Sequence, residues 1–141
     1  MVAYRRPESV LVVVYSRNKQ CLLIERADHA GFWQSVTGGL EEGEGALCCA
    51  QRELFEETGI QAVPKPTGIV NQFKIHPRWR HRYAPQVMEN TETVYSVMLD
   101  KIVEPVLNPQ EHTRYAWLDA ESAMQRCFSH TNADAIKQIV L

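Results

Sequence analysis

Short apolar runs separated by polar turns occupy the first part of the chain. Ser9–Tyr15 and Cys21–Glu25 are rich in β-branched and other apolar residues, and the polar turn 16–19 lies between them. This pattern predicts a β-hairpin. Phe32–Thr37 has the composition of a further strand and leads directly into the glycine pair at 38–39.

Strand-like patterns return in the second half. Two prolines in Gln61–Pro66 argue against regular structure there, and Thr67–Ile75 resumes as a strand. Glu92–Asp100 alternates, but both of its faces are largely apolar, which indicates an interior strand covered on both sides. Arg114–Leu118 is the last predicted strand. His76–Pro85 is basic and bounded by prolines, so it is predicted to be a loop.

Two helices are predicted at the C-terminus. Asp119 is placed to cap a helix that runs through Phe128, and Thr131 or Asn132 to cap a final helix. The final helix has an apolar stripe formed by Ala135, Ile136, Ile139 and Val140. Strands interleaved with helices predict an α/β layered fold without linker or repeat, in a single domain of residues 1–141.

The segment 38–60 carries an unusual group of carboxylates. A helix is expected from Glu44 or Gly45 to Gly59, with an apolar side formed by Leu47, Ala50 and Leu54. Glu53, Glu56 and Glu57 are three and four residues apart, so they share one face of that helix. Like charges so close repel, and a bound hard cation such as Mg²⁺ or Mn²⁺ would stabilise them. A solvated acidic helix face is the alternative.

Composition restricts the partners. The 141 residues include 45% hydrophobic and 23% charged residues, and the net charge of -2 gives no overall attraction to nucleic acid or anionic membrane. The apolar run Val10–Tyr15 is far shorter than the roughly 20 residues that span a bilayer. The four cysteines include no C-x-x-C pair, so a zinc site or disulfide framework is not indicated. A cytoplasmic protein with reduced cysteines is expected.

The spacing of the whole segment is more specific than its carboxylates. It fits G-x5-E-x7-R-E-U-x-E-E-x-G-U, where U is aliphatic, with the fixed residues Gly38, Glu44, Arg52, Glu53, Glu56, Glu57 and Gly59. At about 7% for each residue type, such a match arises by chance on the order of once in a hundred million windows. The segment is identified as a Nudix box, and the chain resembles the Nudix hydrolase family.

The resemblance implies a fold, a cofactor and a reaction. Nudix hydrolases are α/β/α sandwiches with a central mixed sheet, bind divalent metal and cleave diphosphate linkages. By this resemblance Glu53 and Glu57 are the first metal ligands and Glu56 a further or water-mediated one. Arg52 is expected to orient a glutamate. Glu44 is expected to fix the loop or act as an outer ligand, and a simple helix N-terminal charge is the alternative.

Segments outside the box resemble one bacterial subfamily, which hydrolyses dihydroneopterin triphosphate in folate biosynthesis and is also active on deoxynucleoside triphosphates such as dATP. These segments are 4–7, 32–38, 80–85, 90–92 and 117–119. The resemblance implies that Glu111 is a metal-binding carboxylate from outside the box that helps to deprotonate water. It also implies substrate contacts, for which ordinary surface or strand roles are the alternative, at Arg5, Arg26 and Thr37.

Two further residues are weaker candidates for the substrate pocket. Phe73 lies where the subfamily lines its ring pocket and could stack on a planar ring, but it could equally be a core residue of its strand. Ser129, near the last helix, is the second candidate.

Two other functions stay open. Within the enzyme class, the alternative is a house-cleaning pyrophosphatase for oxidised or ordinary nucleotides. The other class is a non-catalytic domain that binds a ligand or RNA, because Arg78, Arg80 and Arg82 alternate with aromatic residues. The expected partner is nevertheless a small-molecule polyphosphate, with no membrane and no prediction of oligomeric state.

Overall fold

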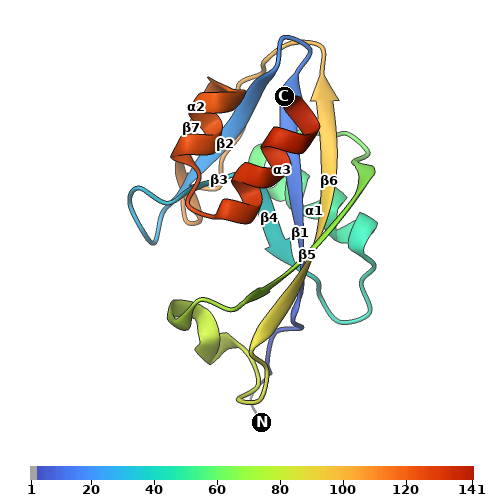
Figure 1. Cartoon of the computed structure of the whole chain (residues 1–141), viewed down its shortest axis with the longest axis vertical. Coiled ribbons are helices and arrows are strands. Elements are labelled where there is room, and N and C mark those ends of the chain that lie inside the picture. The colour runs from blue at the N-terminus through green and yellow to red at the C-terminus, as the bar shows by residue number, and fades with distance from the viewer. Residues whose placement is uncertain (1–2) are drawn as a thin grey trace.

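The computed structural model describes residues 3–141, and its strands form one mixed sheet (Figure 1). The strands are β1 (Glu8–Ser16), β2 (Gln20–Arg26), β3 (Trp33–Gln34), β4 (Val36–Gly39), β5 (Lys65–Lys74), β6 (Glu89–Leu99) and β7 (His112–Asp119). The helices are α1 (Ala46–Thr58), the 3-10 helix η1 (Pro77–Arg82), α2 (Ala120–Arg126) and α3 (His130–Val140). The predicted α/β fold is confirmed.

The centre of the sheet is the parallel pair β1 and β6. Their register runs from Glu8 opposite Thr91 to Ser16 opposite Leu99. The chain between these strands contains the box and β5, which is long enough for the crossover that parallel strands require. Strand β6 is flanked by β1 and β5, so the prediction of an interior strand is correct.

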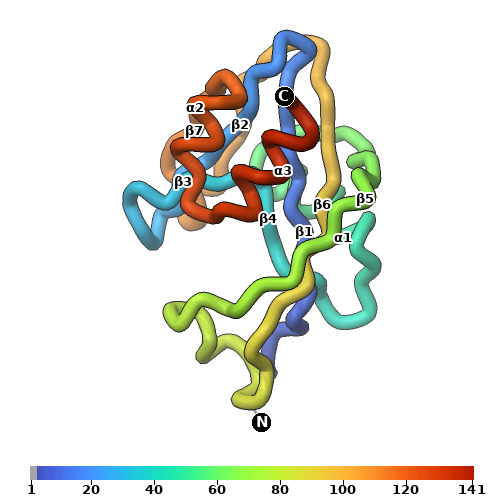
Figure 2. Tube along the Cα trace, in the orientation of Figure 1, coloured from blue at the N-terminus to red at the C-terminus, as the bar shows by residue number. Residues whose placement is uncertain are grey.

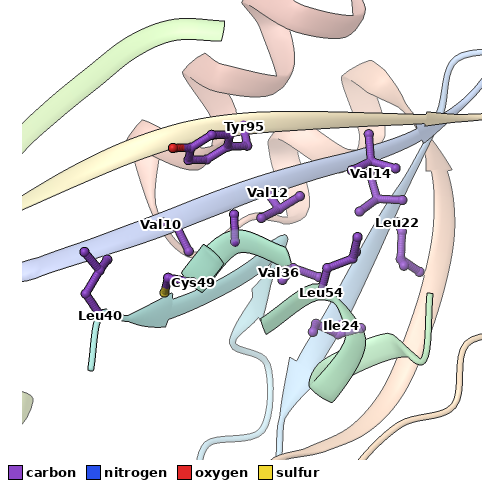
Figure 3. Packing of buried hydrophobic residues seen from close by; sticks show 12 residues of the cluster. Val10, Val12, Val14, Leu22, Ile24, Val36, Leu40, Cys49, Leu54 and Tyr95 are labelled. Carbon is purple, nitrogen blue, oxygen red and sulfur yellow. The ribbon is translucent and has the colours of Figure 1, made fainter. Parts of the chain in front are cut away.

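Helices cover both faces of the sheet. Alternate residues of β1 point to opposite sides. One set packs against α1 in the cluster drawn in Figure 3, which includes Val10, Val12 and Leu54. The other set packs against α2 and α3, where Leu11 contacts the cluster that contains Ile136. In Figure 1, α2 and α3 lie in front of the sheet and α1 behind it, which is the α/β/α arrangement.

One edge of β1 is shared by two strands, and this division positions the site. Strand β4 pairs with residues 9–12 of β1, whereas β2 pairs with β1 at Tyr15 opposite Cys21. Strands β3 and β7 both pair with β2. The end of β4, the far end of β2 and the start of β7 therefore come together beside helix α1.

Several predicted elements differ from the structure. The strand predicted over 32–37 is broken at Ser35. The Ser35 amide donates to Asn132 Oδ1 at 2.8 Å, and the Asn132 side-chain amide donates to the Ser35 hydroxyl at 2.9 Å. The same contact explains why Asn132 does not cap α3, which begins after Ser129. Pro66 lies inside β5, where an edge strand and a shift in register between Pro66 and Val70 tolerate proline.

The predicted burial of Leu47 and the predicted loop at 76–85 were also wrong. Leu47, expected on the apolar side of the box helix, is 42% exposed, and Cys49 occupies the buried position instead. The predicted loop 76–85 contains η1. Pro77 stands in the first turn of η1, and the His76 ring accepts a hydrogen bond from the Arg78 amide at 3.1 Å.

The composition also led to expectations about the cysteines and about membrane-spanning segments. The four cysteines are free, as predicted. Within residues 3–141, no helix has the length and apolar character needed to cross a membrane.

Candidate active site

The box helix α1 is held firmly at its C-terminal end. Gly59 adopts a left-handed conformation, with φ 75°, which suits glycine at a helix end. A Cβ at this position would lie 3.2 Å from the Val106 side chain, and the Val106 amide donates to the Thr58 carbonyl at 2.8 Å. The helix end is therefore fastened to the segment that carries Glu111.

Glu53 and Glu57 form a carboxyl pair on the face of α1 that looks toward β4. Glu57 is 2% exposed and lies within hydrogen-bonding reach of Glu53. Burial raises the pKa of the Glu53 carboxyl, and burial followed by the contact with Glu53 raises the pKa of the Glu57 carboxyl well above its usual range. A buried and a partly buried carboxyl group in this environment supply the oxygen ligands that a hard divalent cation prefers.

Gly38 allows β4 to pass directly over the carboxyl pair. A Cβ built on Gly38 would overlap the carboxylate of Glu53. At the neighbouring Gly39 the nearest atom to such a Cβ is the Glu8 carbonyl oxygen, at 3.8 Å. The close approach of backbone and carboxylate thus explains the glycine at the first position of the motif.

Arg52 binds the outer carboxylates of the box. Its guanidinium holds Glu44 through Nε and Nη2, both at 2.8 Å, and its Nη1 lies 2.5 Å from Glu53 and 3.2 Å from Glu56. It also donates to the Gly39 carbonyl at 3.3 Å. The contact with Arg52 lowers the pKa of the Glu44 carboxyl to about 2. Arg52 therefore joins the segment that carries Gly39 and Glu44 to helix α1. It contacts Glu53 through Nη1.

Glu56 and Glu111 act on the carboxyl pair through their charges: besides burial, the charge of Glu56 contributes to the raised pKa of Glu53, and that of Glu111 to the raised pKa of Glu57. The Glu56 side chain is 52% exposed and contacts Arg52. Glu111 lies in an exposed turn that is fixed through its backbone, since its carbonyl accepts from the Ala27 amide at 2.8 Å. Among residues 3–141, no three His, Cys, Asp or Glu side chains lie close enough together to hold a metal ion. Of the four predicted ligands, only Glu53 and Glu57 are in mutual contact.

One residue that was not predicted as part of the site, His112, lies beside the carboxyl pair. His112 is 5% exposed, with Nε2 at 3.9 Å from Glu57 Oε1 and 3.2 Å from the Gln34 amide nitrogen. Burial, and then the charge of Arg26, lowers the pKa of the His112 imidazole to about 4, so the ring is neutral at pH 7. The only signal in the sequence is the position of His112, directly after Glu111 at the start of a strand.

Three arginines lie near one another beyond His112, and Arg26 is paired with His112 across β2 and β7. Arg26, at the end of β2, binds Asp28 through two hydrogen bonds of 2.8 Å, and its guanidinium carbon lies 5.0 Å from the centre of the Trp79 ring. The Arg5 amide donates to the Arg82 carbonyl at 2.9 Å. Burial and then the charges of Arg5 and Arg26 lower the pKa of Arg82. Arg5, Arg26 and Arg82 are called the arginine cluster below.

The other predicted substrate residues have defined surroundings. The Thr37 hydroxyl donates to the Val10 carbonyl at 2.8 Å. Ser129 precedes α3, and its hydroxyl lies 2.8 Å from that of Thr131. Phe73 is half-buried and belongs to neither core cluster of the described residues, so the alternative that it is a core residue is wrong.

Comparison with known proteins places the chain in a family. Residues 5–139 match the model of the NUDIX domain. The chain belongs to the Nudix family. It is 41% identical to dihydroneopterin triphosphate diphosphatase of Escherichia coli K12 over 98% of this chain and 95% of the relative. The protein of that name from Haemophilus influenzae is 35% identical, over 98% of this chain and 90% of the relative.

A solved Nudix structure is also similar throughout. The E. coli dihydroneopterin triphosphate pyrophosphohydrolase superposes with a TM-score of 0.92 at 41% identity, covering 99% of this chain and 98% of that chain. This chain is a Nudix hydrolase homologous to these enzymes, and the resemblance read from the sequence is confirmed.

Nudix hydrolases generally need divalent metal ions, and the carboxyl pair of this site supplies two ligands of a suitable kind. The carboxyl pair offers hard oxygen ligands. Glu57 is buried and Glu53 partly buried, and on the Glu57 side the pair lies near the His112 imidazole. A bound cation would offset the burial that raises both pKa values.

Proposed function

We propose that this Nudix hydrolase converts dihydroneopterin triphosphate to dihydroneopterin monophosphate and pyrophosphate, and that it also hydrolyses deoxynucleoside triphosphates such as dATP. The observation that carries the proposal is the 41% identity, over nearly the whole of both chains, to enzymes named for the pterin substrate. Activity in the cytoplasm and a single domain spanning residues 1–141 belong to the same proposal.

The reaction is a hydrolysis in which water attacks one phosphorus of the anhydride between the first and second phosphates. The bridging P–O bond breaks, pyrophosphate leaves, and the water supplies the new P–O bond and gives up a proton. Mg²⁺, or Mn²⁺ as a substitute, would neutralise phosphate charge and lower the pKa of the attacking water. We assign Glu53 and Glu57 as its ligands.

The other carboxylates complete the proposed machinery. Glu111 contributes a carboxylate from the segment fastened to the end of α1, where it can bind the metal and accept the proton of the water. Glu56 is a further or water-mediated ligand. Arg52 positions Glu53 and Glu44 and does not need to contact substrate, because its donors are already directed to carboxylates and to the β4 backbone.

The remaining predicted residues are assigned to substrate binding. Arg5 and Arg26 supply positive charge for the phosphates. Thr37 lies beside the carboxyl pair, because its amide faces Glu57 at 3.4 Å. Phe73, as a half-buried aromatic outside the core, and Ser129, at the start of α3, are assigned to the pterin or nucleoside part.

A comparison of kcat/KM with Mg²⁺ tests the substrate. Dihydroneopterin triphosphate, dATP and 8-oxo-dGTP are assayed side by side, and the pterin is expected to be preferred. A preference for either nucleotide by more than about tenfold, or about 1.4 kcal/mol in transition-state binding, overturns the assignment. Preference for 8-oxo-dGTP would indicate a house-cleaning pyrophosphatase, and tight binding without turnover would indicate a non-catalytic domain.

A further inference from the structure

The arginine cluster concentrates positive charge in a chain whose net charge is -2. Four of the seven other arginines, Arg6, Arg17, Arg52 and Arg114, are paired with a nearby carboxylate. Within residues 3–141, neither Arg5 nor Arg82 forms an ion pair, and Arg26 is paired only with Asp28. Among the described residues, the pair of Arg26 with Asp28 is therefore the one ion pair that the cluster forms.

Arg82 reaches this cluster because η1 is fixed against two other loops. Phe32, from the loop between β2 and β3, stacks on Phe128 at 3.8 Å between ring centres. Trp79 of η1 packs edge-on against both rings, at 6.5 Å from Phe32 and 6.3 Å from Phe128. The same Trp79 ring lies under the Arg26 guanidinium. One tryptophan thus ties η1 to the neighbouring loops and to Arg26.

The N-terminal segment completes this unit. The tube in Figure 2 shows the first described residues, from Ala3 on, running close to the segment between β5 and β6 that contains η1. The hydrogen bond from the Arg5 amide to the Arg82 carbonyl fixes that approach. Since the bond uses the backbone, a change of the Arg82 side chain leaves it available.

The arginine cluster is also joined to the carboxyl pair. Arg26 and His112 are paired across β2 and β7, and His112 lies 3.9 Å from Glu57. The order along the site is therefore carboxyl pair, His112 and Arg26. A ligand that carries several phosphates can meet the metal-binding carboxyls at one end and the arginines at the other.

We propose that Arg82 is a substrate-binding residue that, together with Arg5 and Arg26, binds the phosphates of the triphosphate substrate. This inference rests on the proposed function of the site. It gives the basic segment 78–83 a role in recognising a small polyanion. The rival role, stacking on the bases of single-stranded nucleic acid, is disfavoured because Trp79 is engaged with Phe32, Phe128 and Arg26.

Arg80 provides the matched control. It lies on the same 3-10 helix and is exposed, but its guanidinium contacts the Met88 sulphur at 2.8 Å, away from the other arginines. Arg82→Ala and Arg80→Ala remove the same charge from the same element. Arg82→Lys keeps the charge and removes the planar fork of donors.

The first measurement is calorimetric binding of inorganic tripolyphosphate in the presence of Mg²⁺. Arg82→Ala is expected to weaken binding about tenfold or more, which is the usual effect of losing hydrogen bonds to a charged group, whereas Arg80→Ala changes it less than about twofold. Arg82→Lys should lie between the two. Equal effects of Arg82→Ala and Arg80→Ala would overturn the assignment, because they would reflect net charge alone.

Turnover and nucleic-acid binding separate the remaining outcomes. With dATP, Arg82→Ala should raise KM about tenfold and leave kcat within about threefold of wild type, as expected for a group that contacts the phosphates before and during reaction. One outcome is that wild type hydrolyses neither dihydroneopterin triphosphate nor dATP while Arg82→Ala still weakens tripolyphosphate binding. In that case the proposed function fails and the role of Arg82 in binding phosphates stands. If both alanine variants instead weaken binding of a single-stranded oligonucleotide and leave tripolyphosphate binding unchanged, the role of Arg82 fails.

Discussion

Glu57 enters the site from within helix α1 and is almost fully buried, whereas Arg82 enters it from the last residue of η1 and is half-exposed. The helix behind Glu57 packs into the core through Cys49, Ala50 and Leu54. The arginines are held by loops, a short 3-10 helix and backbone hydrogen bonds. The carboxyl pair is thus held rigidly by a core helix, at the cost of desolvating its carboxyl groups. The arginine cluster is held by loops and can adjust its position more easily.

This difference predicts how each part responds to mutation. Burial of the carboxyl pair disfavours its charged form in the free protein, so a ligand that restores charge balance can bind strongly there. The arginine cluster remains partly hydrated, and each guanidinium contributes a limited amount to affinity. Changes to the carboxyl pair should therefore lower kcat, and changes to the arginine cluster should mainly raise KM.

The largest effect is expected for Glu57→Gln. Since loss of an outer-shell partner of a metal ligand already costs about 10–100-fold, loss of a ligand should lower kcat at least 100-fold at saturating Mg²⁺. The metal-free variant should unfold at the same or a higher temperature, because a neutral amide replaces a buried acid beside Glu53. Glu42→Gln, an exposed change in the same segment, is the control. Near-normal turnover of Glu57→Gln would remove Glu57 from the proposed ligands.

Arg52→Lys tests whether the carboxyl pair depends on its neighbours. A lysine cannot hold Glu44 through two parallel hydrogen bonds and at the same time reach Glu53, so we expect kcat to fall about 10–100-fold with little change in KM. Steady-state kinetics with titrated Mg²⁺ measures both values. Arg17→Lys, at a surface ion pair with Asp100, serves as control. A change in KM alone would instead indicate that Arg52 contacts substrate.

Gly38→Ala and Gly39→Ala form a matched pair with a smaller expected effect. The added methyl group at Gly38 overlaps the Glu53 carboxylate, which must move, whereas the methyl group at Gly39 has room. Gly38→Ala should lower kcat about tenfold, in line with disturbance of a group next to the metal, and keep the fold. Gly39→Ala should remain within about twofold of wild type. Equal activities would show that Glu53 can move without consequence.

The carboxyl pair could be predicted from the sequence because its geometry is local. Residues four apart on one helix share a face, so the spacing of Glu53 and Glu57 determines their contact before any tertiary structure forms. The two faces of β6 could be predicted for the same reason, since alternation along a strand is local.

The arginine cluster could not be predicted in this way, because it depends on contacts between distant segments. Arg82 lies beside Arg26 only because Trp79 packs against Phe32 and Phe128. The break at Ser35 likewise depends on Asn132, 97 positions away. Such pairings leave no periodic pattern in the chain.

The smallest effect concerns Glu25, which supports the loop that carries Asp28, the partner of Arg26. Its carboxylate accepts from Arg114 at 2.7 and 3.0 Å and from the Gly31 amide at 2.8 Å. The hydrogen bond from Arg114, and then that from Gly31, lowers the pKa of Glu25 to about 2. The folded state therefore binds this proton less readily than the unfolded state, whose carboxyl titrates near 4.5.

The stabilisation that Glu25 provides should accordingly be complete above about pH 4.5 and decline as the pH falls toward 2. We expect wild type to have a slightly higher urea midpoint than Glu25→Gln at pH 6, and the difference to shrink progressively at pH 4 and pH 3. Other acidic groups are common to both proteins and cancel in the comparison. A difference that stays constant with pH would mean that the glutamate acts through packing and not through its charge. In that case the loop beside the arginine cluster would be held without electrostatic help.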